Sequence, residues 1–144
     1  MGSAPRIRSA VAGDAAQLAA LSSQLGYPTT PAQARERLVL LHDPERALLV
    51  ADGDGGLAGF IDVHVQRVVE SDPYGEVGGL VVAQGRRGHG VGAALLAAAA
   101  QWCRARGLGR LWIRANLARV GPHEFYEHVG CRRVKDQRVY EYPL

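Results

Sequence analysis

The sequence contains little of what would place it in one of the specialised classes of protein. Cys103 and Cys131 are its only cysteines, too few for a disulfide framework and without the spacing of metal ligands. The longest uninterrupted apolar run, residues 93–100, is mostly alanine and is far shorter than the roughly 20 residues that a membrane-spanning helix needs. These absences exclude a disulfide-stapled scaffold, a cysteine metal centre and a spanning apolar helix.

Lysine is almost absent as well, because Lys135 is the only one among 17 basic residues, and the net charge is +3. The arginines are dispersed, with no basic arm and no aromatic RNA-binding strand, so we expect no nucleic acid partner. No two of the five histidines have the spacing of a helical ligand pair, and we predict no metal. Arg6 and Arg8 precede any apolar segment, unlike a signal peptide, so we expect a cytoplasmic protein with no membrane partner.

A chain of 144 residues that is 47% hydrophobic has the size and composition of one globular domain, which we predict over residues 1–144. Hydrophobic periodicity predicts the element order β-α-α-β-β-β-α-β-α-β-β and hence an α/β fold with a sheet of mixed direction. The expected strands are 6–11, 47–51, 57–68, 76–82, 110–115, 131–135 and 138–142. The expected helices run from Asp14 to Gly26, from Thr30 through Leu41, from Val91 to about Arg106 and from Pro122 to Gly130, and residues 70–75 are expected to be a loop.

The most informative segment is residues 80–92, where an apolar strand enters a turn with two arginines and closely spaced glycines, and a helix rich in alanine and leucine follows. A helix N-terminus after a glycine turn offers backbone N–H groups and a favourable dipole to an anion. Arg87 is placed to hold a pyrophosphate oxygen with its guanidinium fork. The segment therefore predicts a phosphate-binding turn.

The glycine spacing alone also fits a dinucleotide fingerprint, with Gly88, Gly90 and Ala93 as G-x-G-x-x-A. A Rossmann domain usually carries this turn in its first βα unit, whereas here it lies beyond mid-chain. The strand that follows ends in Asn116 rather than in an acid placed for a ribose hydroxyl. A P-loop is excluded because no Gly-Lys-Ser/Thr follows.

Read as R-x-x-G-x-G from Arg87 to Gly92, the turn resembles the acetyl-CoA signature of the GNAT superfamily of N-acetyltransferases. The preceding Leu80-Val81-Val82, the later Asn116, the Phe125-Tyr126-Glu127 helix and Gly130 also stand in that family's order. The resemblance implies a GNAT-like mixed central sheet of about six to seven strands flanked by about four helices, with acetyl-CoA as acyl donor. It assigns the donor site to Leu80, Val81, Val82, Arg87, Gly88, His89, Gly90, Val91, Gly92, Ala93 and Asn116.

An attacking amine must lose a proton, because an alkylammonium has a pKa near 10.4. Glu76 is the candidate base, since simple alternation puts it on one strand face with Gly78, Leu80 and Val82. Many members of the family carry a glutamate where this chain has Gly78, so action through water, or Asp62 or His64 on the preceding strand, stay open as alternatives. The pair Gly78-Gly79 weakens a strand unless a bulge or a close approach requires it.

The leaving thiolate must be protonated, and Tyr126 matches the general acid of the family's Phe-Tyr pair. Asn116 matches a position that contacts the pantetheine or adenosine part of the cofactor, with a turn-forming role as the alternative. Arg119 is either a second phosphate contact or a solvated arginine, and we interpret His123 as structural or adjacent to the cofactor. The backbone N–H of Val82 is the expected donor to the oxyanion.

The sequence thus predicts an N-acetyltransferase that moves acetyl directly from CoA to a primary amine of a small molecule or protein in a ternary complex. By analogy with the family, residues 26–30 and 70–74 line the acceptor site, where Glu70 and Asp72 would suit a cation. The alternatives are a non-catalytic acyl-CoA-binding regulatory module on the same fold and a nucleotide-binding oxidoreductase. The Tyr140/Tyr142 alternation also permits a homodimer paired through the C-terminal strands, as in many small members of the family.

Overall fold

The computed structural model describes residues 5–115 and 120–144, so Asn116 and Arg119 lie outside the described residues. The chain forms two compact units, Met1–Ile113 and Arg114–Leu144. None of the helices in the described ranges is long and apolar enough to cross a membrane.

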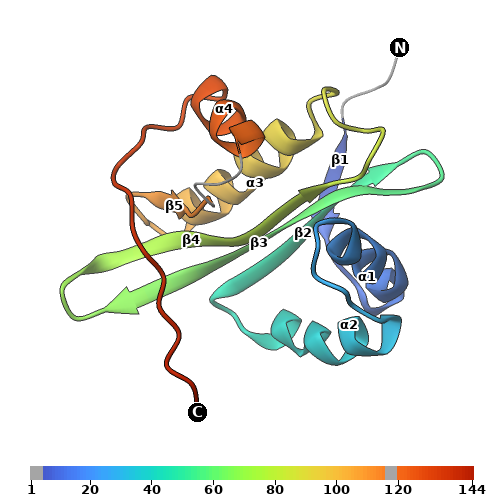
Figure 1. Cartoon of the computed structure of the whole chain (residues 1–144), viewed down its shortest axis with the longest axis horizontal. Helices are drawn as coiled ribbons and strands as arrows, with labels where there is room; N and C mark the ends of the chain where they lie inside the picture. Colours follow the sequence, from blue (N-terminus) through green and yellow to red (C-terminus); the bar gives the residue numbers. More distant parts are fainter. Residues whose placement is uncertain (1–4, 116–119) are drawn as a thin grey trace. The chain divides into compact units, whose positions relative to one another are not determined.

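The first unit is built on one sheet with strand order β1-β2-β3-β4-β5 (Figure 1). Neighbouring strands are antiparallel except for β4 and β5, which pair in parallel. The long β3 and β4 form a hairpin, and the tight turn that Gly55 and Gly56 allow joins β2 to β3. The strands are β1 (Arg6–Ser9), β2 (Arg46–Gly53), β3 (Gly56–Val68), β4 (Ser71–Val82) and β5 (Leu111–Ile113).

The ends of the helices of this unit follow local sequence signals, but the α-helix expected through Leu41 ends at Arg37 and continues as a 3₁₀ turn from Leu38 to His42. Thr30 caps α2, its hydroxyl accepting from the N–H of Gln33, and Pro31 is the first helical residue. Gly26 and Gly107, with φ of 105° and 74°, follow the ends of α1 and α3. The α-helices are α1 (Ala15–Gln24), α2 (Pro31–Arg37) and α3 (Val91–Ala105), and two 3₁₀ turns are η1 (Ala12–Asp14) and η2 (Leu38–His42).

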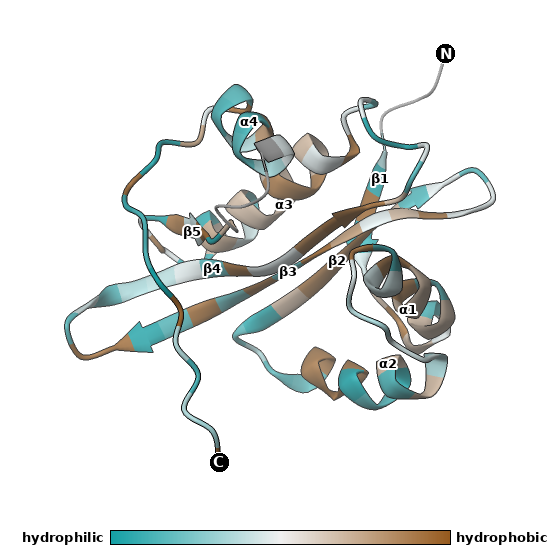
Figure 2. Cartoon of the chain, viewed as in Figure 1, coloured by the Kyte–Doolittle hydropathy of each residue, from teal (hydrophilic) through white to brown (hydrophobic). Residues whose placement is uncertain are grey.

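A hydrophobic core lies on each face of the sheet. Side chains of α1 and α2 pack with Val50 and Val81 on one face, whereas α3 packs with Ile61 and Val63 on the other, around the fully buried Leu95. Figure 2 shows the matching hydrophobic stripe along the middle of the sheet. The arrangement confirms the predicted α/β class, with helices on both faces of a mixed sheet.

Two expectations about elements are wrong. Residues 70–75 are not a loop, because β4 starts at Ser71 and its backbone groups pair with β3, which outweighs the turn-like composition. Residues 131–144 form no strand, so the described residues give five strands rather than six to seven. Tyr140 and Tyr142 alternate as in a strand, but they are 83% and 85% exposed, and no neighbouring strand pairs with their backbone among the described residues. The second unit contains one helix, α4 (Val120–His128).

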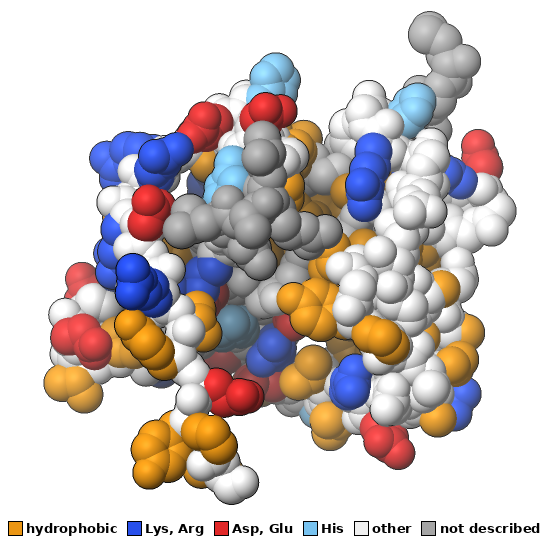
Figure 3. Space-filling view, viewed as in Figure 1, with side chains coloured by type: hydrophobic (Ala, Val, Ile, Leu, Met, Phe, Trp, Pro, Cys, Tyr) orange, Lys and Arg blue, Asp and Glu red, His pale blue; other side chains and the backbone are white. Residues whose placement is uncertain are grey.

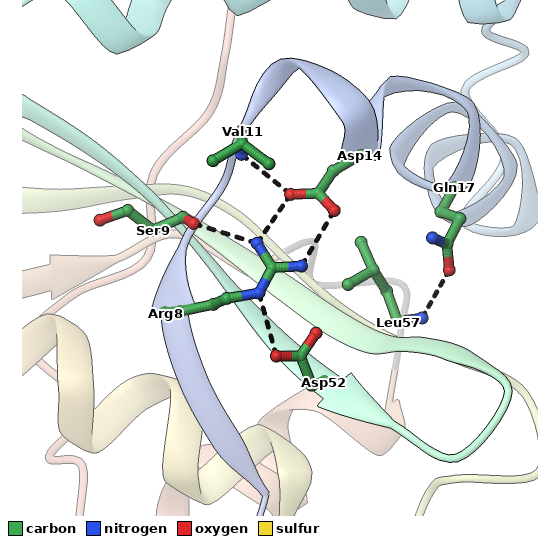
Figure 4. A network of polar contacts seen from close by, with 7 residues as sticks. All are labelled: Arg8, Ser9, Val11, Asp14, Gln17, Asp52 and Leu57. Carbon is green, nitrogen blue, oxygen red and sulfur yellow. Dashed lines mark hydrogen bonds and ion pairs between the residues drawn. The ribbon is translucent and has the colours of Figure 1, made fainter.

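A partly buried ion-pair network joins Arg8 of β1 to Asp14 of η1 and Asp52 of β2 (Figure 4). The Arg8 guanidinium donates to both carboxylate oxygens of Asp14, at 2.9 and 3.0 Å, and to Asp52 at 2.9 Å. Asp14 also accepts the N–H of Val11 at 2.9 Å, so it caps η1 rather than α1, where we expected it to act. These hydrogen bonds lower the pKa of the Asp14 carboxyl, the Arg8 bond most of all.

We predict that Asp14→Asn destabilises the protein at pH 7 by about 2 kcal/mol. The substitution removes a carboxylate that is only 7% exposed and leaves Arg8 with Asp52 as its one remaining ion-pair partner among the described residues. The folded pKa lies below the unfolded value of about 3.9, so this stabilisation is present above that pH and is lost as the pH falls through the folded pKa. Urea unfolding of wild type and D14N at pH 7 and pH 3 measures both effects. Glu45→Gln, which breaks an exposed pair with Arg67, is the control and should leave the midpoint nearly unchanged. An equal gap at both pH values would contradict the prediction.

Candidate active site

The turn between β4 and α3 leaves a helix N-terminus open. Gly85, Gly88 and Gly90 have φ of 80°, 82° and 81°, a left-handed backbone that favours glycine. Gly90 is the N-cap of α3, and no side chain in the described residues caps the helix. The N–H groups of its first turn are therefore available to an anion.

The two arginines of this turn are in different situations. Arg86 is tied back, because its guanidinium donates to the carbonyl oxygen of Asp54 in the β2–β3 turn. Arg87 is exposed and forms no ion pair within the described part of the chain. Of the two arginines, Arg87 is the exposed one, and its role as a phosphate ligand stays a prediction.

Strand β4 parts from β5 well before it ends. Only the segment from Gly75 to Val77 pairs with β5, and no other strand of the described residues takes over that edge. The Ala83 N–H bonds to Ala58 of β3 at 2.8 Å, so by alternation the backbone groups of Val82 and Leu80 point to the opposite edge. An open strand edge therefore leads into the glycine turn.

A β-bulge interrupts β4 at its glycine pair. Val63 of β3 lies opposite Val77 of β4, and the adjacent Asp62 lies opposite Gly79, so Gly78 has no partner in β3. A Cβ on Gly78 would lie 3.0 Å from the Asp62 Oδ2 atom, a tight contact that the Asp62 side chain would have to relieve by a small shift. The bulge that the consecutive glycines indicated is therefore present.

The bulge changes which face of the sheet alternate side chains of β4 point to. Val77 packs against α3 before the bulge, so Glu76 faces the α1–α2 side, whereas after the bulge Leu80 and Val82 pack on the α3 side and Val81 on the other. The expectation that Glu76 shares a face with Leu80 and Val82 is therefore wrong, because simple alternation does not hold across an inserted residue.

Four polar and aromatic residues form a row across the sheet on the Glu76 face. Arg46, His64, Glu76 and Trp112 lie directly opposite one another on β2, β3, β4 and β5. The His64 Nε2 and Glu76 Oε2 atoms are 3.6 Å apart, and the two side chains are 22% and 14% exposed. The other ring nitrogen, Nδ1 of His64, is buried and without a hydrogen-bond partner among the described residues. The row brings a carboxylate and an imidazole together in a partly dry environment.

The second candidate carboxylate, Asp62, is engaged in a fork-to-fork pair. Arg46 donates to its two oxygens at 3.0 and 2.8 Å, and this bonding raises the pKa of the Arg46 guanidinium. Both oxygens of Asp62 are therefore occupied by hydrogen bonds from Arg46. No three His, Cys, Asp or Glu side chains gather as metal ligands in the described ranges.

An aromatic cluster ends the row at β5. The rings of Tyr74 and Trp112 have centroids 4.9 Å apart, and the Arg110 guanidinium lies 4.8 and 4.7 Å from them. Sequence analysis did not single out Arg46, Arg110 or Trp112. Arg110 and Trp112 sit at alternate positions of the predicted strand 110–115, which is a signal for them, whereas Arg46 lies one residue before the predicted strand 47–51. Pairing register is needed to bring the three together.

The remaining predicted groups lie in the helix of the second unit or buried beneath the sheet. Phe125 and Tyr126 stack edge to face in α4, and partial burial raises the pKa of the Tyr126 phenol. Cys103 is buried as expected at 3% exposure, and burial raises the pKa of its thiol. Burial likewise raises the pKa of the Cys131 thiol.

Comparison with known proteins agrees with this geometry. The model of the acetyltransferase (GNAT) family matches residues 15–131. The aminoglycoside N(6')-acetyltransferase type 1 of Stenotrophomonas maltophilia is 33% identical over 147 residues, which cover 99% of this chain and 95% of that protein.

Solved structures share the fold at lower identity. Aminoglycoside N-acetyltransferase AAC(6')-Iy in complex with CoA has a TM-score of 0.87 at 20% identity, over 100% of this chain and 98% of that one. A transcriptional regulator from Bacillus halodurans C-125 has a TM-score of 0.84 at 21% identity, over 96% of this chain and 100% of that one. With a family match over most of its length and a close curated relative, this chain belongs to the acetyltransferase (GNAT) family and is an N-acetyltransferase.

Proposed function

We propose that this enzyme transfers the acetyl group of acetyl-CoA directly to a primary amine of a small cationic molecule, within a ternary complex. The observation that carries the proposal is the course of β4, which presents Glu76, then an open backbone edge, then a phosphate-binding turn within one continuous segment. A donor with a reactive thioester, an amide-bearing arm and a pyrophosphate needs these features in this order.

The pyrophosphate is proposed to bind at the glycine turn. The backbone N–H groups of the turn and of the first turn of α3 supply hydrogen bonds, and the exposed Arg87 supplies charge. The residues proposed to donate hydrogen bonds or supply charge to the pyrophosphate are Arg87, Gly88, His89, Gly90, Val91, Gly92 and Ala93.

The pantetheine arm is proposed to pair with the open edge of β4 as an added strand would. Leu80 and Val82 both direct N–H groups to that edge, with Val81 between them bonding to β3. One of these N–H groups donates a hydrogen bond to the pantetheine arm. The other donates to the thioester oxygen and stabilises the charge that develops on it. Val82 is the donor that we proposed from the sequence, and Leu80 lies closer along the strand to Glu76.

Glu76 is the proposed general base, acting on the ammonium directly or through water. The geometry supports it over Asp62, since both oxygens of Asp62 are held by Arg46. His64, beside Glu76, is placed to share or pass on the proton that the carboxylate takes. The amine then attacks the thioester carbonyl, the C–N bond forms, and the C–S bond breaks as the tetrahedral intermediate collapses.

The departing CoA thiolate needs a proton, for which Tyr126 is the proposed source. The raised pKa of its phenol keeps it protonated at neutral pH, as a general acid must be. A covalent acyl-enzyme is disfavoured, because both cysteines have raised thiol pKa values and a thiolate is the nucleophilic form. These two properties support direct transfer in a ternary complex.

The acceptor is proposed to be a small molecule with more than one amine. The 33% identical aminoglycoside N(6')-acetyltransferase supports a polycationic acceptor. Asp72 is exposed and lies four residues before Glu76 on the same strand, about 13 Å away at the usual rise of a strand. That separation suits a molecule with one amine at Glu76 and a second cation at Asp72, whereas Glu70 lies beyond it, at the hairpin tip.

The loop of residues 26–30 is proposed to line the same acceptor site. It follows Gln24, whose side chain contacts the end of β4, so it starts beside the donor edge. Hydrophobic side chains gather over α1, α2 and the loop between them in Figure 3. The large exposed residues of this region include Tyr27 and Val39, at 68% and 65% exposure. They would contact the ring carbons of an amino sugar.

The first test of the proposal is an amine panel with acetyl-CoA as donor and thiol release as readout. Aminoglycosides and linear polyamines should be acetylated, while monoamines such as butylamine should be poor acceptors. We expect Asp72→Asn to raise KM for polyamines about fivefold, the loss of one exposed charge contact, and to leave KM for a monoamine unchanged. Tight CoA binding with no turnover on any amine would favour the regulatory module instead.

We predict that Gly90→Ala weakens CoA binding about tenfold, because alanine at a φ of 81° is strained by about 1 kcal/mol and distorts the N-terminus that meets the pyrophosphate. Gly107→Ala is a matched control at the other end of α3, where φ is 74° and a Cβ likewise meets nothing within 4 Å. Both variants should lose similar stability in thermal unfolding, but only G90A should raise Kd in calorimetry with CoA. Equal Kd values for the two variants would argue against the turn as the binding site.

We predict that Glu76→Gln lowers kcat by about 10²- to 10⁴-fold, the usual contribution of a general base, while Kd for CoA stays unchanged. The glutamine keeps the size of the side chain but cannot take the proton. Glu36→Gln, an exposed acid of α2, is the control for the loss of one negative charge. Stopped-flow or steady-state thiol release measures kcat, and a rate within threefold of wild type would remove Glu76 from the mechanism.

A further inference from the structure

The side chain of Gln24, the last residue of α1, forms two hydrogen bonds with backbone groups at the end of β4. The Gln24 Nε2 atom donates to the Val82 carbonyl oxygen at 2.9 Å, and the Gln24 Oε1 atom accepts the N–H of Gln84 at 2.9 Å. The two residues bound are separated from Gln24 by 58 and 60 positions in the chain, so this is a tertiary contact. It falls where the open edge of β4 becomes the glycine turn.

The pattern of these bonds is that of a parallel strand. In a parallel pair, one residue donates to the carbonyl before its partner and accepts from the N–H after it. The side-chain amide of Gln24 makes both bonds around Ala83, as the N–H and C=O of one residue in a parallel neighbour would. Since β5 pairs with β4 only up to Val77, Gln24 supplies a single residue of the missing neighbour at the far end of the open edge.

We propose that Gln24 is a positioning residue for the acyl-CoA donor, an inference that rests on the proposed function. By taking the Val82 carbonyl and the Gln84 N–H, it fixes the backbone at the junction of the two donor-binding parts. The N–H of Val82 and both backbone groups of Leu80 remain directed to the open edge. There the pantetheine arm can bond to them as a strand would. The arm and the pyrophosphate of CoA can then be bound together only if this junction keeps one geometry.

The test replaces Gln24 with methionine, which has a similar length but forms neither hydrogen bond. Calorimetry with CoA should give a Kd about tenfold higher than wild type, since about 1.4 kcal/mol corresponds to the net loss of two hydrogen bonds. Steady-state kinetics should show a raised KM for acetyl-CoA, with kcat and its pH profile nearly unchanged. A merely structural role for Gln24 would lower stability without this selective rise in Kd.

Gln17→Met is the matched control, because Gln17 lies on the same helix and accepts the N–H of Leu57 at 2.6 Å, a bond to β3 rather than to the backbone of β4. Q17M should lose stability as Q24M does, and its Kd for CoA should stay within twofold of wild type. Gln24→Glu gives the same test if Q24M does not fold, since it keeps an acceptor for Gln84 but turns an oxygen toward the Val82 carbonyl.

The outcomes separate the two proposals. Wild-type binding of CoA with a Kd for Q24M or Q24E within twofold of it would overturn the role of Gln24 and leave the proposed function standing. Absence of CoA binding in the wild-type protein would overturn the proposed function and this inference with it. A parallel rise in Kd for Q17M and Q24M would also overturn the inference, because it would trace the effect to general destabilisation.

Discussion

Backbone hydrogen bonding along β4 is divided among three kinds of partner, and the site depends on that division. The strand bonds to β3 over most of its length, with Gly78 unpaired at the bulge, to β5 only from Gly75 to Val77, and to the side chain of Gln24 at its end. Beyond Val77, no other strand of the described residues pairs with this edge of β4. In this enzyme the open stretch runs from the bulge at Gly78 to the turn that leads into α3.

The bulge at Gly78 gives the same strand two chemical faces. Before it, Glu76 joins the row that contains His64, and after it Leu80 and Val82 pack against α3. A regular strand would direct Glu76 and Leu80 to one face of the sheet. A side chain at Gly78 would come into tight contact with the Arg46–Asp62 pair.

The charged groups of the first unit fall into two sets with different surroundings. Arg8 with Asp14, and Arg46 with Asp62, are fork-like pairs in which hydrogen bonds satisfy both oxygens of the acid. The contact between His64 and Glu76 is longer, at 3.6 Å, and leaves a buried imidazole nitrogen without a partner among the described residues.

The sequence by itself determined most of the elements and the glycine turn. Glycine and proline at element ends, the Thr30 cap and the run from Leu80 to Gly92 act locally, so their consequences can be read without a fold, and together they indicated the family. Tertiary structure alone decided which face Glu76 occupies, that Arg46 neutralises Asp62, and that Gln24 completes the edge of β4. It also decided that residues 71–75 extend β4 and that residues 131–144 form no strand. The reason is that strand register, bulges and pairing partners depend on backbone groups far apart in the chain, which alternation within one segment does not record.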